Sequence, residues 1–148
     1  MRIGIVALLG LLLLRTWFTP AIISGASMEP TLDSGDIYLV NRWVYGVLSP
    51  QRGDIVFVRE NDENAFLVKR VIGLPGDEVK MIWGQVFING VLIPEPYRDA
   101  LPGWSMLPVT LRADEYWVIG DNRNVSSHHT VERNQIVGRF CENRVRPG

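Results

Sequence analysis

The sequence predicts an all-β protein, a small antiparallel barrel or sandwich, that follows one apolar amino-terminal segment. Short stretches rich in valine, isoleucine and aromatic residues recur from residue 24 onward, and turn residues separate them. Asn89-Gly90, at the end of one such stretch, is a strong signal for a hairpin turn. The 148 residues suffice for one modest core, so we divide the chain into an amino-terminal membrane anchor, residues 1–23, and a β-rich domain, residues 24–148.

The amino-terminal segment holds an unbroken apolar run at residues 3–14, between Arg2 and Arg15. A run without a polar face is unlike a helix that packs on a soluble core. It fits a secretory signal peptide with the small residues 24–26 as its cleavage site, or a membrane anchor that ends near Phe18 or Ile23. A membrane span needs about 20 residues, so hydropathy alone leaves both interpretations open.

The expected strands are short, and turn residues bound them. They cover residues 36–40, 54–59, 66–72, 79–83, 85–88, 115–119 and 136–141. Residues 94–108 are rich in proline, so we expect a loop there. This spacing of strands and turns is typical of a small antiparallel sheet protein.

Charge and cysteine content exclude several classes of function. The formal net charge of −1 argues against a strongly basic nucleic-acid binder. Cys141 is the single cysteine, which excludes an internal disulfide framework and a cysteine-based metal cage. The adjacent pair His128 and His129 does not have a standard zinc-ligand spacing. We therefore expect neither a metal nor another cofactor.

Ser27 and Lys69 are a possible nucleophile and base. Ser27 lies in a segment rich in glycine and proline, and a serine becomes a nucleophile only when a base removes its proton. Arginine is a poor base, and the chain has only two lysines, Lys69 and Lys80. Lys69 lies in an apolar run, where desolvation would lower its pKa. From these residues alone, an exposed turn serine and an ordinary edge-strand lysine remain the alternative.

Four segments, in this order, resemble the type I signal peptidases, membrane-anchored Ser/Lys endopeptidases that remove signal peptides. They are Ser-Met-Glu-Pro-Thr-Leu at 27–32, Arg-Gly-Asp-Ile-Val-Phe at 52–57, Lys-Arg-Val-Ile-Gly-Leu-Pro-Gly-Asp at 69–77, and Gly-Asp-Asn-Arg at 120–123 with Ser126 and Ile-Val-Gly-Arg at 136–139. Each segment alone is weak, but the four together cover nearly the whole chain.

The resemblance implies roles for the matched positions. Ser27 would be the nucleophile and Lys69 the general base, and Ser126 would orient the lysine amine through a hydrogen bond. The backbone N–H of Ser27 would donate to the oxyanion. Gly25 stands in this oxyanion-hole segment, where some members of the family carry a serine whose hydroxyl also donates. The substrate would bind as an extended strand, with small residues before the cut.

One segment departs from the family pattern. After Gly-Asp-Asn-Arg the family usually continues to Ser-x-Asp-Ser-Arg, whereas this chain, from Ser126, has His128 for the aspartate and Thr130 for the arginine. Both charges are replaced together, so neither partner is left alone, but the surroundings of the site must be built differently. His128 could be a hydrogen-bonding support, a pH-sensitive element or a surface loop residue. We interpret Asp121 as a structural turn residue.

Another apolar segment, residues 43–48, lies between two expected strands. We expect Trp43 and Tyr45 to sit at the membrane interface near the substrate cleft, as the resemblance implies for this region.

The resemblance as a whole implies a serine endopeptidase that cuts preproteins after small residues, contacts membrane lipid and binds no nucleic acid. It favours an anchor over a removed signal peptide, and places the chain in the cytoplasmic (inner) membrane of a bacterium, single-pass, with its catalytic domain on the extracytoplasmic side. Three alternatives stay open. The first is a specialised Ser/Lys peptidase for a pilin or a conjugation protein, and the second is an inactive relative that binds signal peptides. The third is a self-cleaving repressor-type protease of the same fold.

Overall fold

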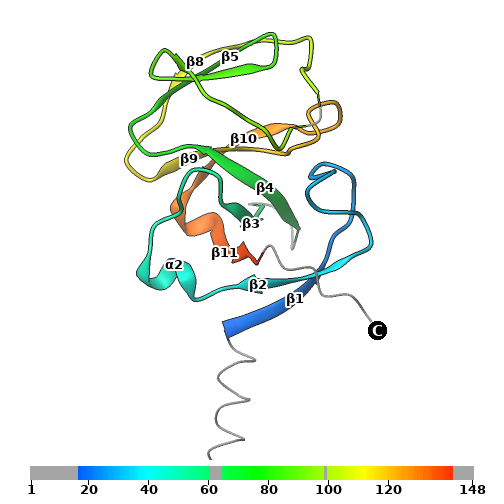
Figure 1. Cartoon of the computed structure of the whole chain (residues 1–148). Coiled ribbons are helices and arrows are strands. Elements are labelled where there is room, and N and C mark those ends of the chain that lie inside the picture. Colours follow the sequence, from blue (N-terminus) through cyan, green and yellow to red (C-terminus); the bar gives the residue numbers. More distant parts are fainter. Residues whose placement is uncertain (1–16, 61–64, 99, 142–148) are drawn as a thin grey trace, which may run out of the picture.

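The computed structural model describes residues 17–60, 65–98 and 100–141, which form two antiparallel sheets (Figure 1). The larger sheet has the strand order β1 (Phe18–Ile22), β2 (Ile37–Asn41), β11 (Ile136–Phe140), β3 (Ile55–Arg59), β4 (Phe66–Gly73), β9 (Glu115–Ile119) and β10 (His128–Glu132). The smaller sheet has the order β7 (Val91–Leu92), β6 (Gln85–Ile88), β5 (Glu78–Ile82) and β8 (Met106–Thr110). One short helix, α2 (Val44–Val47), follows β2, and one 3-10 turn, η1 (Arg133–Gln135), precedes β11.

The mostly-β prediction is confirmed, but the barrel is not. In the part of the chain that the structure describes, β1 and β10 stay at opposite edges of the larger sheet, so the sheet does not close. Pro20 lies within β1 and has no N–H to donate, which suits an edge strand. Figure 1 shows the smaller sheet stacked at one end, above β4, β9 and β10.

The seven expected strands correspond to β2, β3, β4, β5, β6, β9 and β11. The expected hairpin turn at Asn89-Gly90 joins β6 to β7, and both residues have positive φ, 51° and 81°. Such φ values are typical of a tight hairpin turn, in which asparagine and glycine are favoured.

The strand β1 corrects the expected end of the anchor at residue 23. Its residues pair with β2 from Phe18 opposite Asn41 to Ile22 opposite Ile37. The apolar composition of this stretch fits an anchor and a strand equally, and only the pairing with β2 decides between them. The rest of the predicted anchor, residues 1–16, lies outside the described residues. No helix within 17–60, 65–98 and 100–141 has the length and apolar character that a membrane span needs.

Strands β8 and β10 were not expected. β8 is an exposed edge strand that contains Pro108. It begins within the stretch predicted as a loop and ends two residues beyond it. β10 begins at His128 and is also an edge strand, with Val131 as its one fully buried residue. Edge strands bury little, so they lack the alternation that reveals a strand in a sequence.

The two faces of the larger sheet pack into different parts of the core. Ile72, Trp117 and Ile119 pack against the smaller sheet. Val71 and Val118 lie on the opposite face, in a cluster with α2 and β11. A third cluster joins the loop after β1 to β2, β3 and β11, and it buries Met28, which is 1% exposed. Burying a side chain of this size contributes about 1.5–3 kcal/mol, and it fixes the loop that carries Ser27.

Candidate active site

Ser27 lies in the loop between β1 and β2, and its neighbours in the core fix its position. Met28 and Leu32 are buried, and the Ser27 carbonyl accepts a hydrogen bond from the Asn122 N–H at 3.1 Å. The half-buried Ser27 is therefore held from both sides, by the core and by the turn after β9. Among the described residues no hydrogen bond engages the Ser27 N–H, which leaves it available as a donor.

Gly25 precedes Ser27 by two residues and has φ +97°. This left-handed backbone conformation favours glycine. The Gly25 N–H donates to the Ser34 hydroxyl at 3.2 Å, so this N–H points into its own loop. Gly25 thus shapes the loop rather than presenting its N–H to the pocket.

Lys69 is buried in β4, with 4% of its surface exposed. Its amine donates a hydrogen bond to the Ser126 hydroxyl at 3.0 Å. Burial lowers the pKa of Lys69 below its ordinary range, and the negative charge of Glu60 acts in the opposite direction. A lysine in such surroundings can hold a neutral amine and accept a proton.

The Ser126 hydroxyl has three hydrogen-bond partners. It accepts from the Lys69 amine and, at 2.8 Å, from the Gly120 N–H. It donates to the Ser127 carbonyl at 3.1 Å. A hydroxyl has one proton and two lone pairs, so these three bonds fix its orientation.

Gly120 is a residue of the site whose role the sequence analysis did not recognise. A Cβ at this position would lie 2.1 Å from the Ser27 carbonyl oxygen and 2.4 Å from the Ser126 Oγ. Only glycine lets these two segments approach each other so closely, because real Cβ contacts are far longer. The signal in the sequence was its place at the start of Gly-Asp-Asn-Arg.

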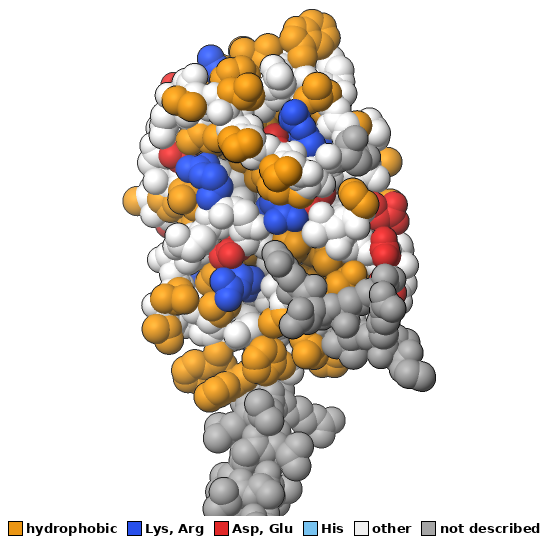
Figure 2. Space-filling model, in the orientation of Figure 1, with side chains coloured by type: hydrophobic (Ala, Val, Ile, Leu, Met, Phe, Trp, Pro, Cys, Tyr) orange, Lys and Arg blue, Asp and Glu red, His pale blue; other side chains and the backbone are white. Residues whose placement is uncertain are grey.

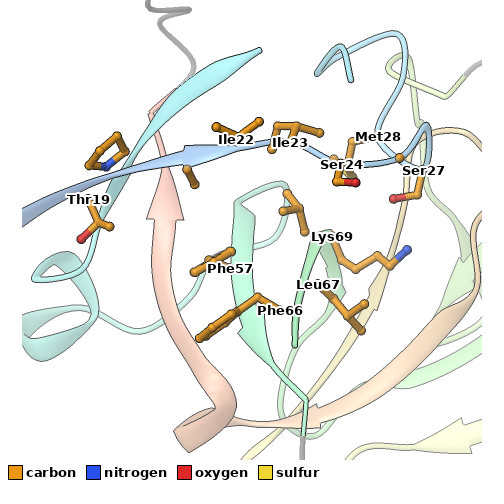
Figure 3. A pocket seen from close by; sticks show the side chains of 14 residues that line it. Thr19, Ile22, Ile23, Ser24, Ser27, Met28, Phe57, Phe66, Leu67 and Lys69 are labelled. Carbon is orange, nitrogen blue, oxygen red and sulfur yellow. The ribbon is translucent and has the colours of Figure 1, made fainter. Parts of the chain in front are cut away.

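Ser27 and Lys69 line one pocket with a volume of about 380 Å³. Figure 3 shows the Ser27 hydroxyl and the Lys69 amine directed toward the same end of this pocket, one from the loop after β1 and the other from β4. Most other residues of its wall are apolar, among them Ile23, Phe57 and Val68.

The pocket lies between two strand edges. β1 is an edge strand of the larger sheet. β9 pairs with β4 from Arg70 to Gly73, so in the described structure residues 66–69 have a strand partner on their β3 side alone. An extended peptide could therefore form main-chain hydrogen bonds along the pocket.

A buried ion pair supports the site from behind. The Arg70 guanidinium donates to both carboxylate oxygens of Asp121, at 2.8 and 2.6 Å, and the Thr31 hydroxyl donates to the same carboxylate at 2.5 Å. These residues adjoin Lys69, Gly120 and the Ser27 loop, so one carboxylate ties the three segments together. Asp121 is structural, as expected, whereas the sequence analysis did not identify Arg70 and Thr31 as its partners.

A second buried pair anchors the segment after β7. Arg123 donates to the Glu95 carboxylate and, through Nε, to the Gly120 carbonyl at 3.0 Å. Both side chains of this pair are fully buried. The pair holds the turn after β9 against the smaller sheet.

The two histidines point to opposite faces of β10. His128 is opposite Ile119 and stacks between two tryptophans. Its ring centroid lies 5.2 Å from that of Trp104 and 5.6 Å from that of Trp117. His129 is opposite Val118, whose face of the sheet also includes Val71. A hydrogen-bonding support was one of three alternatives for His128, but strand alternation directs this residue toward the smaller sheet and His129 toward the Lys69 side.

The segment after β2 also differs in part from its expectation. Trp43 is 56% exposed, whereas Tyr45 is buried and donates its hydroxyl to Asp54 at 2.7 Å. The expectation that Tyr45 lies at a membrane interface is therefore wrong, because the helical turn of α2 directs this ring into the core.

The family model described as signal peptidase, peptidase S26, matches residues 1–141. The chain belongs to this family. Its members are serine endopeptidases, and the similar proteins carry the name signal peptidase I.

Two relatives and one crystal structure illustrate this similarity. The chain is 40% identical over 138 residues to a probable signal peptidase I-2 of Synechocystis, an alignment that covers 85% of this chain but 63% of that protein. It is 38% identical over 154 residues to signal peptidase I S of Bacillus subtilis, covering 97% of this chain and 80% of the relative. The crystal structure of a signal peptidase I from Enterococcus faecalis matches with a TM-score of 0.53 and 25% identity, over 64% of this chain and 99% of that one.

Proposed function

We propose that the chain removes signal peptides from preproteins by Ser/Lys chemistry, with Ser27 as the nucleophile and Lys69 as the general base. Membership of the signal peptidase family supports removal of signal peptides by a serine peptidase. The observation that carries the residue assignment is the buried Lys69 amine, bonded to Ser126 and facing the same pocket end as Ser27.

The chemistry runs through an acyl-enzyme. Neutral Lys69 takes the proton of the Ser27 hydroxyl as Oγ attacks the carbonyl carbon of the scissile peptide bond. The Ser27 N–H stabilises the oxyanion that forms. The Lys69 ammonium then gives its proton to the departing amine, and the signal peptide stays bound to Ser27 as an ester. Water attacks this ester, Lys69 accepts a proton from the water, and the proton returns to Ser27 as the ester breaks.

Ser126 keeps the lysine in the orientation that this chemistry needs. Since the Ser126 proton goes to the Ser127 carbonyl, Ser126 can only accept from the amine. The lone pair of neutral Lys69 is then left free for the Ser27 proton.

The substrate would add as an extended strand between β1 and the open edge of β4. The pocket of about 380 Å³ and its mostly apolar lining support an extended segment with uncharged side chains, and the family resemblance implies small residues before the cut. Main-chain hydrogen bonds would supply affinity, and the pocket would supply specificity.

An exposed apolar surface supports contact with membrane lipid. The ring centroids of Trp17 and Trp43 lie 5.6 Å apart, and Val47 and Leu48 are exposed beside them. Figure 2 shows hydrophobic side chains gathered at the lower end of the molecule, near β1 and α2. Tryptophan prefers the headgroup region, so this end would rest on the bilayer. The apolar residues 3–14 would form the single anchor, with the β-rich domain on the extracytoplasmic side of a bacterial membrane.

The test uses the full chain in detergent and a preprotein with an Ala-x-Ala site. Wild type should cut at this site, and Ser27→Ala and Lys69→Met should not, because methionine keeps the stem and removes the amine. Lys80→Met, at the other lysine, is the matched control and should cut normally. Cleavage that survives Lys69→Met would contradict the assignment of the base. Binding of the preprotein without cleavage by wild type would indicate an inactive relative.

A further inference from the structure

The hydrogen bonds of Ser126 continue beyond the residues assigned so far. The Ser126 hydroxyl donates to the Ser127 carbonyl, and the Ser127 side chain is hydrogen-bonded to His129, with 2.8 Å between Oγ and Nε2. A continuous path therefore leads from Lys69 through Ser126 and Ser127 to His129. This path is distinct from the ion pair of Arg70 and Asp121.

We propose that His129 is a positioning residue for the Ser/Lys pair, which holds Ser127 in the place where its carbonyl orients the Ser126 hydroxyl. The proposal rests on the function proposed above and extends it by one residue. In the described structure His129 does not line the substrate pocket and is not hydrogen-bonded to Lys69. It therefore acts through Ser127.

The orientation of Ser126 matters because its proton has two possible acceptors. In the structure the Ser127 carbonyl accepts it. If this carbonyl moved away, the hydroxyl could rotate and donate to the nitrogen of neutral Lys69 instead. That bond would occupy the lone pair that must receive the Ser27 proton. The position of Ser127 thus decides whether Lys69 is free to act as a base.

Ser127 depends on a side-chain tether because its own surroundings are open. It is exposed, in the segment between the turn after β9 and the start of β10. His129 is half-buried and fixed in β10, opposite Val118 of β9. The bond between them therefore links a loop residue to a rigid strand, which restricts the motion of the loop.

The charges around His129 favour its neutral form. Burial lowers the pKa of His129, and so does Lys69 on β4 whenever its amine is protonated. Glu60, which follows β3, raises this pKa, and His128 lowers it slightly. A neutral imidazole offers one donor and one acceptor nitrogen, and either role at Nε2 maintains the bond to the Ser127 hydroxyl.

The test compares two amides at position 129. The glutamine amide reaches about as far as Nε2 and the asparagine amide only as far as Nδ1, so His129→Gln can keep the bond and His129→Asn cannot. With the Ala-x-Ala preprotein, His129→Asn and His129→Ala should lower kcat about fivefold, the value of one ordinary hydrogen bond, with KM unchanged. His129→Gln should stay within about twofold of wild type. His128→Ala is the control, and it should lower the melting temperature while kcat is retained.

A double-mutant cycle with Ser127 tests the route of the effect. In a Ser127→Ala background, His129→Ala should cost nothing further, because the bond is already lost. A wild-type kcat in His129→Ala, or the same fivefold loss in both backgrounds, would overturn this proposal alone. An inactive wild type, or full activity in Lys69→Met, would overturn the proposed function and this proposal together.

Discussion

Replacing Gly120 by alanine should separate Ser27 from Ser126. The new Cβ would lie 2.1 Å from the Ser27 carbonyl oxygen, 2.4 Å from the Ser126 Oγ and 2.9 Å from the Ser126 Cβ. The first distance is more than 1 Å short of an ordinary contact, and its atom belongs to the backbone, which cannot rotate aside. The Ser27 loop must therefore move, and the hydrogen bond from the Asn122 N–H to the Ser27 carbonyl stretches with it.

A shift of about 1 Å between reacting groups can cost about 100-fold in rate, so we expect kcat/KM of Gly120→Ala to fall by about that factor. Crowding of this kind also costs about 1–3 kcal/mol of stability. The assay is cleavage of the Ala-x-Ala preprotein, with urea unfolding in parallel. Gly103→Ala is the matched control, because nothing lies within 4 Å of its added Cβ. Wild-type kcat/KM in Gly120→Ala would refute the convergence of Ser27 and Ser126 at this glycine.

Three further predictions concern the base, the buried ion pair and the apolar surface. Because only the neutral amine of Lys69 can accept the Ser27 proton, kcat/KM should fall as the pH drops through the lowered pKa of Lys69, below the value of about 10.4 for an exposed lysine. A pH profile that rises only near 10.4 would contradict this. Asp121→Ala should destabilise the protein by about 3–5 kcal/mol in urea unfolding, since the buried Arg70 loses its carboxylate partner. A loss below about 1 kcal/mol would show that the pair is not important for stability. Trp43→Ser should weaken liposome binding with the melting temperature retained, whereas Tyr45→Ser should lower the melting temperature. Equal liposome binding by Trp43→Ser and wild type would show that Trp43 does not contact the membrane.

The central strands could be predicted from the sequence because both their faces are buried. In β4 and β9 most residues pack on one sheet face or the other, which produces apolar runs between turn residues. The edge strands β1, β8 and β10 could not be predicted, since their exposed residues carry no such pattern. Their place in the sheets depends on partners elsewhere in the chain.

For the site, the resemblance pointed to Ser27 and Lys69, which line one pocket, and to Ser126, which is hydrogen-bonded to Lys69. It did not identify Thr31 and Arg70, which meet Asp121 across 90 and 51 positions of the chain. Such contacts follow from the packing of loops against strands, which a single sequence does not encode locally. The sequence assigned no role to His129, because without the register of β10 nothing shows which of two neighbouring residues faces Lys69.

The place of β11 in the larger sheet has a consequence for the order of folding. Within the larger sheet, β11 lies between β2, which follows the Ser27 loop, and β3, whose neighbour β4 carries Lys69. Val40 of β2 is opposite Phe140 of β11, and Val56 of β3 is opposite Arg139, so residues close to the end of the described chain join the two halves. β11 follows both halves in the chain, so the two halves can be joined into one sheet only after β11 has been synthesised. The Ser27 loop and the Lys69 strand would therefore reach their final spacing late in folding.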